Sequence, residues 1–192
     1  MTLMQNIDIN QLLDWVPNPA LAELPAVQEN EHRLGMRQFA AATTVITTLH
    51  QQQPSGLTAT AVCSVTAEPA RLVAFVNKNT YAAQQILQSG LLCINALAGD
   101  QAELACIFAG MRKAIAPQDR FQHGQWDTLV TGAPALKGAK ANFDCRVVKV
   151  FDESTHYAFL CDVLATQSNE DSSALLYMGG AFYTLSATPV AI

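Results

Sequence analysis

FAAATTVITT, at residues 39–48, opens the part of the sequence that decides the fold class. β-Branched residues fill this stretch and two later ones, GLTATAVCSV and RLVAFVN, and such residues suit the half-buried surface of a sheet. The intervening QQQPSG at 51–56 and AEP at 67–69 have the composition of turns. The sequence therefore predicts three consecutive strands, over residues 43–49, 57–65 and 71–77.

The rest of the chain alternates helical patterns with further strands. Apolar residues recur at helical spacing over 81–88, with Asn79 or Thr80 as the N-cap and Gly90 as the stop. Further strands are expected over residues 91–97, 143–151, 157–165, 174–178 and 181–185, the last two joined by a Gly179-Gly180 turn.

The middle of the chain holds a second helix and a long connection. Asp100 and Glu103 have the spacing of a capping box, so a helix should open there. Residues 111–140 contain several glycines and prolines, and a connection of this length without a role is unusual. We expect part of it to cover a site.

The N-terminal residues have a different character. Apolar residues recur at helical spacing over 7–16, and a second short helix fits between Pro19 and Pro25. We expect residues 1–32 to form a helical leader, an arm that packs on the domain or on a partner subunit. The main domain is then 33–192.

The order of these elements predicts the architecture. About eight strands with two internal helices, and no regular β-α-β alternation, favour a mainly β fold. We expect a Greek-key-like antiparallel barrel that carries helices, rather than a doubly wound sheet.

Composition excludes several classes of protein. Half of the 192 residues are hydrophobic, 14% are charged and the net charge is -5, which predicts a compact domain and disfavours binding to nucleic acid or an anionic membrane. The sequence has neither an apolar run long enough for a membrane helix nor a signal-like start, so we expect a cytoplasmic protein. Five cysteines without C-x-x-C, and four dispersed histidines, predict reduced core thiols and no metal site.

Hydroxyl residues alternate with small or apolar ones along 39–48 and 56–69. Side chains alternate between the two faces of a strand, so one face could offer hydroxyl and backbone donors to a planar polar ring. Threonine is also simply a good strand former. Phosphate-binding glycine loops, a nucleophile elbow and the H-E-x-x-H motif are absent.

An ordered set of weak motifs decides between these interpretations. After residues 39–48 and 56–69 come Val76-Asn77-x-x-Thr80, Gly90 through Asn95 to Leu97, Asp100-Gln101, Leu104, Phe108-Ala109, Arg120-Phe121, Trp126, Gly132-Ala-Pro134, Leu136-x-Gly138-Ala139, Asp144-Cys145 and Leu175-Leu-Tyr177. From about Met36 to Leu185 the sequence resembles the flavin reductase-like family of FMN-binding split barrels, the short-chain NAD(P)H:flavin oxidoreductases.

The resemblance implies a split β-barrel homodimer that holds flavin between its subunits. NADH or NADPH would give a hydride to FMN, or to FAD, and a flavin-dependent monooxygenase would be the partner that receives reduced flavin. The cofactor does the chemistry, and the protein supplies orientation and access. The residues expected to bind the cofactor are Thr43, Thr44, Val45, Thr58, Thr60, Ala61, Val62, Cys63, Ser64, Asn77 and Thr80.

Charged and titratable residues complete the expected site. Asn77 and Thr80 precede a helix whose N-terminus favours a phosphate, although Thr80 is also an ordinary N-cap. The basic residues that could add charge are Lys78, Arg112, Lys113 and Arg120.

His156 is the catalytic candidate that the resemblance implies. The family often has Gly-Asp-His there, whereas this chain has Ser154 and Thr155 before the histidine. A neutral imidazole could bind the nicotinamide carboxamide, and the alternative is a hairpin histidine that faces solvent. Other departures are Ala42 for glycine and Val62 for phenylalanine.

Two other functions stay open. A flavin-binding electron carrier or sensor without reductase turnover would fit the departure at Thr155 and the unusual leader. A split-barrel oxidase acting on a phosphorylated vitamin would require more Arg and Lys than the 11 present.

Overall fold

The structure, a computed structural model, describes residues 18–185, and the chain divides after Met36 into two units. The first unit holds α2 (Pro19–Ala22), where a short helix is expected, and α3 (Glu29–Met36), where no helix is predicted. The helix expected over 7–16 lies outside the described residues. α3 spans the proposed boundary at 32/33, and that division of the chain stays a prediction.

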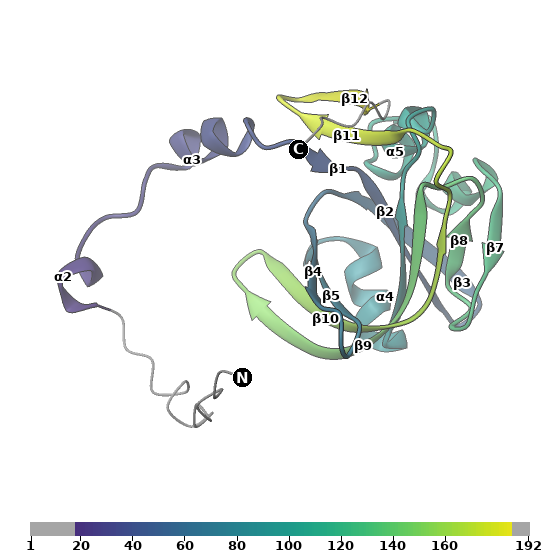
Figure 1. The fold of residues 1–192 in the computed structure, drawn as a ribbon, viewed down its shortest axis with the longest axis horizontal. Helices are drawn as coiled ribbons and strands as arrows, with labels where there is room; N and C mark the ends of the chain where they lie inside the picture. The colour runs from purple at the N-terminus through teal and green to yellow at the C-terminus, as the bar shows by residue number, and fades with distance from the viewer. Residues whose placement is uncertain (1–17, 186–192) are drawn as a thin grey trace, which may run out of the picture. The chain divides into compact units, whose positions relative to one another are not determined.

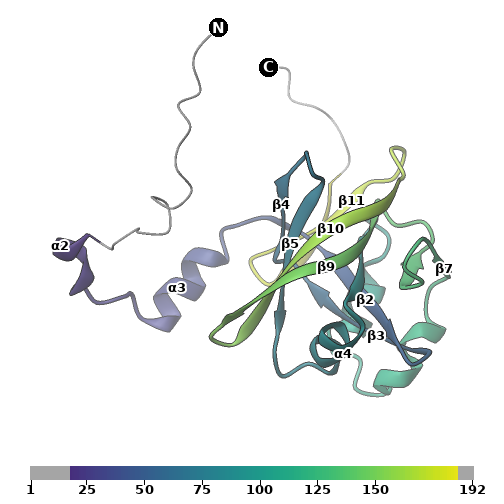
Figure 2. The same ribbon diagram turned by 90° about the horizontal axis from the view of Figure 1, so that it is seen from below.

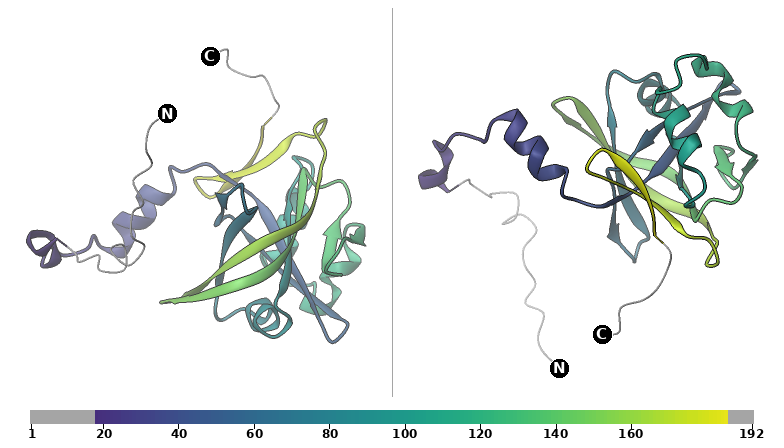
Figure 3. Two further views of the ribbon diagram at one scale, coloured as in Figure 1. Left: turned by 60° about the horizontal axis from the view of Figure 1, so that its bottom comes forward. Right: turned by 90° about the horizontal axis from the view of Figure 1, so that it is seen from above.

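The second unit is built on one curved antiparallel sheet (Figures 1 and 2). Its strand order is β3-β2-β6-β9-β10-β5-β4. The strands are β2 (Thr44–His50), β3 (Gln53–Ala59), β4 (Val62–Thr66), β5 (Arg71–Asn77), β6 (Leu91–Ala96), β9 (Ala141–Glu153) and β10 (His156–Ser168). β9 and β10, 13 residues each, run side by side through it (Figure 3). The expected mainly β, antiparallel fold is confirmed.

Smaller elements surround this sheet. β1 (Ala41–Ala42), β11 (Ala174–Met178) and β12 (Ala181–Leu185) form a three-stranded sheet, and β7 (Trp126–Thr128) pairs with β8 (Pro134–Leu136). The helices are α4 (Tyr81–Ser89), α5 (Ala102–Phe108) and the 3-10 helix η1 (Pro117–Gln122). No helix among residues 18–185 is long and apolar enough to cross a membrane.

Two apolar clusters form the core. One joins α4 to the main sheet through buried residues such as Ile46, Ile86 and Phe159. The other lies around α5, where Phe108 contacts Phe121 and Trp126 with ring centroids 5.1 and 5.5 Å away. The long connection 111–140 is thereby anchored, since η1 and β7 supply both partners of Phe108.

The loop expected over 51–56 is wrong. Only Gln51 and Gln52 turn, with φ of 48° and 61°, and β3 begins at Gln53. β3 is an edge strand, which tolerates a proline such as Pro54. Gly56 is required by packing, because a Cβ there would lie 2.9 Å from the Ile46 carbonyl oxygen and 3.1 Å from the Phe108 ring.

The single strand expected over 57–65 is also wrong. The chain leaves β3 at Ala59, crosses at Thr60 and Ala61, and enters β4 at Val62. β3 pairs with β2, whereas β4 pairs with β5. β3 and β4 are therefore the two opposite edges of the same sheet. Residues 60–61 therefore link the two edges.

Local signals predict both ends of α4 correctly, whereas the signal for the start of α5 is wrong. Thr80 caps α4 through its hydroxyl and Gly90 ends it with φ of 69°, as expected. α5 has Gln101 at its N-cap without a side-chain cap, so the predicted capping box is absent. Glu103 instead accepts hydrogen bonds from Arg112.

Candidate functional site

Two adjoining cavities lie along β3, and the first of them also borders the link between β3 and β4. Their volumes are about 300 and about 880 Å3, in the range of small-molecule sites. They share four lining residues, Leu57, Thr58, Asn77 and Ala109. We call the pair the groove, with a first cavity of about 300 Å3 and a second cavity of about 880 Å3.

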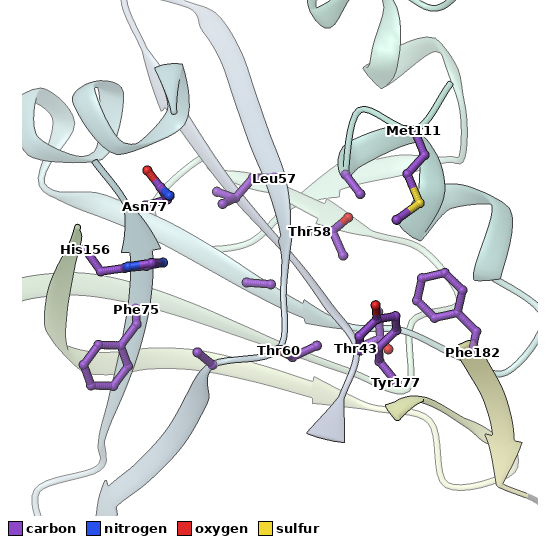
Figure 4. Close-up of a pocket in the computed structure, with 13 residues that line it drawn as sticks. Thr43, Leu57, Thr58, Thr60, Phe75, Asn77, Met111, His156, Tyr177 and Phe182 are labelled. Carbon is purple, nitrogen blue, oxygen red and sulfur yellow. The ribbon is translucent and has the colours of Figure 1, made fainter. Parts of the chain in front are cut away.

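The first cavity has apolar walls and a few polar groups (Figure 4). His156 and Asn77 lie on one side, and Tyr177, Phe182 and Met111 on the other. Tyr177 and Phe182 contact each other across the β11–β12 hairpin, with ring centroids 5.3 Å apart. The hairpin and the loop after α5 thus enclose a space whose other side is the main sheet.

Thr43, which lines this space, has an unpaired hydroxyl. The residue is 1% exposed, and its Oγ1 has no hydrogen-bond partner among the described residues. Its backbone N–H donates to the Leu175 carbonyl and its carbonyl accepts from the Leu97 N–H, both at 2.9 Å. The backbone is therefore fully used, and the hydroxyl is what the residue offers to a ligand.

The threonines of β2, the strand that follows Thr43, use their hydroxyls inside the protein. Thr44 donates to the Ala59 carbonyl at 2.7 Å, and Thr47 and Thr48 donate to carbonyls of β6. The hydroxyl-rich pattern is therefore structural on this strand, and the unpaired hydroxyl belongs to Thr43, just before it.

The link at Thr60 and Ala61 offers backbone groups. Both residues line the first cavity, and neither N–H donates to another atom within residues 18–185. The Ala61 carbonyl accepts from the Phe75 N–H at 2.9 Å, which fixes the link to β5. Unpaired N–H groups arise here because one strand ladder has ended and the next has not begun.

The second cavity combines features that favour an anion. The N-terminus of α4 borders it at Thr80, Tyr81 and Ala82, and free N–H groups and the helix dipole favour negative charge there. Arg120 lines the same cavity, and its buried Nε has no partner among the described residues. The buried Ser55 hydroxyl, which also has no partner among the described residues, is a third polar group at this cavity.

Thr80 uses its hydroxyl in the protein. Its Oγ1 donates to the Asn77 carbonyl at 2.8 Å and accepts from the Ala83 N–H at 3.2 Å. The ordinary N-cap role is thus present at the wall of the second cavity, and the sites for a ligand there are the remaining N–H groups of the turn.

Of the four basic residues considered from the sequence, Arg120 is the one that lines the groove. Lys78 is paired with Asp152, and Arg112 with Glu103. Hydrogen bonds from Arg112 lower the pKa of Glu103. Lys113 lines neither cavity.

His156 begins β10 opposite Asn77 and borders the first cavity. Its Nδ1 lies 2.8 Å from the Thr155 hydroxyl, and the ring extends toward the cavity (Figure 4). The histidine therefore does not simply face solvent.

The structure brings together seven of the twelve residues proposed for the site. They are Thr43, Thr58, Thr60, Ala61, Asn77, Thr80 and His156. The other five do not line the groove: Thr44 and Val45 are buried in β2, and Val62, Cys63 and Ser64 lie along the edge strand β4.

Sequence reasoning missed much of the groove wall. The residues not proposed for it include Pro54, Ser55, Leu57, Phe75, Met111, Gln118, Tyr177 and Phe182. The length of the connection 111–140 did point to Met111 and Gln118, but apolar side chains such as Phe75 and Phe182 look like ordinary core residues in a sequence.

None of the five cysteines is a lining residue of the groove. Burial, the largest effect, raises the pKa of Cys93 and of Cys161 to about 12, and it also raises the pKa of Cys145. Residues 18–185 contain no cluster of three His, Cys, Asp or Glu side chains placed to hold a metal.

Comparisons with known proteins agree with this geometry. Residues 36–186 match the family model described as "Flavin reductase like domain". A protein from Ancylobacter novellus named FMN reductase (NADH) RutF is 36% identical over 172 residues, covering 90% of this chain and 93% of the relative. A protein of the same name from Stutzerimonas stutzeri is 40% identical over 164 residues, covering 85% and 92%.

Solved structures give the same result. The flavin reductase PheA2 superposes with a TM-score of 0.76 at 29% identity, covering 84% of this chain and 100% of that one. BorF, the flavin reductase component of a bacterial two-component tryptophan halogenase, gives a TM-score of 0.75 at 28% identity, covering 83% and 99%. By its fold, its sequence and the model that spans most of its length, this chain belongs to the flavin reductase-like family.

Proposed function

We propose that the protein is an NADH-dependent FMN reductase. One observation carries the proposal beyond family membership: the three buried side-chain polar atoms without partners in residues 18–185 belong to Thr43, Ser55 and Arg120, and all three residues line the groove. Buried polar groups are normally paired, so three such atoms along one groove indicate a polar ligand. The relatives named FMN reductase (NADH) support FMN as this ligand and NADH as the co-substrate.

The groove suits FMN in shape and in charge. The first cavity, with an apolar wall, the Thr43 hydroxyl and the N–H groups of Thr60 and Ala61, fits a flat ring with polar edges. The second cavity, with Arg120 and the α4 N-terminus, fits a phosphate. When bound, FMN supplies the acceptor for a hydride from NADH.

The protein's own part is binding and orientation. Thr43 and the link at 60–61 would fix the ring edge, Arg120 the phosphate, and His156 a carbonyl oxygen of the incoming nucleotide. The apolar wall of Phe75, Met111 and Phe182 would exclude water from the ring. Cys63 and Ser64 would reach the flavin through a partner subunit or not at all.

The proposal extends to a homodimer. β4 pairs only with β5 and leaves its outer edge without a neighbouring strand in the described residues. Val65 on this strand is half exposed, and Phe75 and Val150 are more than a third exposed. Exposed edges and apolar patches of this kind are usually covered. We further propose a cytoplasmic location and a flavin-dependent monooxygenase or halogenase as partner, the last supported by the description of BorF.

Aerobic oxidation of NADH and NADPH, with and without FMN, tests the function. We expect FMN-dependent consumption of NADH. A protein that binds FMN but consumes neither nucleotide would be an electron carrier or sensor, and one that does not bind FMN would contradict the flavin assignment.

Arg120→Met tests how the groove is occupied. We expect it to weaken FMN binding about tenfold while leaving riboflavin binding unchanged, because only FMN carries the phosphate and a charge-assisted hydrogen bond is worth about 1.5 kcal/mol. Arg112→Met is the matched control, since Arg112 is paired with Glu103 outside the groove. Equal loss of FMN and riboflavin would contradict the assignment of Arg120.

A further inference from the structure

The turn between β9 and β10 places a hydroxyl beside His156. Ser154 adopts φ of 47°, and Thr155 follows it with its Oγ1 2.8 Å from His156 Nδ1. The Thr155 carbonyl accepts a hydrogen bond from the Lys78 N–H at 3.0 Å. The hydroxyl is thus held beside one ring nitrogen by a backbone contact of its own residue.

The side chain of Lys78 makes a second set of contacts with this turn. Its ammonium group donates to the Ser154 carbonyl at 2.6 Å and is paired with the Asp152 carboxylate. It also lies over the Tyr157 ring, 5.1 Å from the centroid. Lys78 lies between Asn77 and Thr80, which line the groove, so the turn that carries Thr155 is joined to the wall of the groove.

The hydrogen bond at Nδ1 determines what the other nitrogen can do. A neutral imidazole has one N–H, and the partner of one nitrogen selects the tautomer. If the Thr155 O–H donates to Nδ1, the ring proton resides on Nε2, the nitrogen left for the cavity that the ring enters (Figure 4). Lys78 cannot replace the hydroxyl, because its ammonium group is already engaged.

We infer that Thr155 is a positioning residue that holds His156 in the Nε2–H tautomer, so that the imidazole presents an N–H donor to the first cavity. This inference rests on the proposed function, in which that donor meets a carbonyl oxygen of the incoming nucleotide. Thr155 itself touches no ligand. Its effect is exerted through the histidine.

Histidine ring 15N chemical shifts of the full chain test the tautomer without any ligand. The chain has four histidines, and the signals that disappear in His156→Ala belong to His156. We expect wild type and Thr155→Ser to show His156 protonated at Nε2. Thr155→Val, which keeps the β-branched shape and loses the hydroxyl, should show a mixture of tautomers.

Kinetics supply the second measurement. Thr155→Val should lower kcat/KM for NADH about fivefold, the order expected for one misplaced hydrogen bond, with FMN affinity unchanged and with recovery in Thr155→Ser. Thr155 is an exposed turn residue, so the melting temperature should not change.

Two results would overturn the inference: wild-type His156 protonated at Nδ1, or a Thr155→Val spectrum identical to that of wild type. If no variant oxidises NADH, the proposed function fails, while the spectra still decide the tautomer. If Thr155→Val does not fold, Thr155→Ala, which also lacks the hydroxyl, takes its place in the same spectra.

Discussion

At the scale of single residues, the groove is defined by hydrogen bonds that the protein does not make. Thr43, Thr44 and Thr47 are all buried on or beside β2, yet only Thr43 has a hydroxyl without a partner among the described residues. A sequence identifies all of them as strand residues with hydroxyls. Which of them faces a ligand depends on register and on β11, whose Leu175 carbonyl fixes Thr43, and neither is visible in the local sequence.

Thr43→Val should separate binding from stability. We expect FMN binding to weaken about fivefold, since one hydrogen bond contributes about 1 kcal/mol. The melting temperature should not fall, because no protein group loses a partner. Fluorescence titration of FMN and thermal unfolding measure the two effects.

Thr44→Val is the matched control. It removes the hydrogen bond to the Ala59 carbonyl, so the free energy of unfolding should fall by about 1 kcal/mol while FMN binding is retained. Unchanged FMN affinity in Thr43→Val would show that its hydroxyl does not meet the ligand.

At the scale of elements, the sequence predicts structure that depends on local signals and misses structure that depends on long-range strand pairing. α4 and the β11–β12 hairpin follow the predictions, because a cap, a stop and a Gly-Gly turn act within a few residues. The break at Thr60-Ala61 was missed because it depends on two different partner strands. The break supplies the N–H donors of Thr60 and Ala61 to the groove. The family resemblance indicated these two residues as part of the site, whereas the periodicity of the sequence predicted one continuous strand there.

Gly90 offers a test of the stop at the end of α4. Its φ of 69° is left-handed, and a Cβ there would have no atom within 4 Å, so a substitution changes backbone strain alone. Gly90→Ala should lower the free energy of unfolding by about 1 kcal/mol, and Gly90→Asn by less, because asparagine tolerates this conformation. Urea unfolding measures both, and equal losses would exclude backbone strain as the cause.

At the scale of the whole molecule, the proposed dimer can be tested through Cys63. It is the exposed thiol of edge strand β4, whereas Cys106 is partly buried on α5. If β4 meets a second copy, alkylation of Cys63 should slow as protein concentration rises, with that of Cys106 unchanged. Equal rates at all concentrations, together with a monomeric sedimentation profile, would exclude an interface at β4.

Alkaline pH should destabilise the fold through its buried thiols. Burial raises the pKa of Cys93 and Cys161 from 9.0 to about 12, so the folded chain keeps thiols protonated that the unfolded chain ionises. Their contribution is complete below pH 9.0 and is lost as pH rises toward about 12. Urea unfolding at about pH 8 and about pH 10 should show this loss, and Cys161→Ala should reduce it.

Thr60 and Ala61 connect the two edge strands of the main sheet, β3 and β4. The first cavity of the groove lies beside this connection. Much of the wall of the groove comes from β3, the link, the β11–β12 hairpin and the segment after α5, whereas the buried core draws mainly on β2, β5, β6, β9, β10, α4 and α5. Substitutions at Thr60, Met111 or Tyr177 therefore change what the groove accepts without disturbing the residues on which folding depends. Descendants of this chain can acquire new ligand preferences while the scaffold is inherited intact.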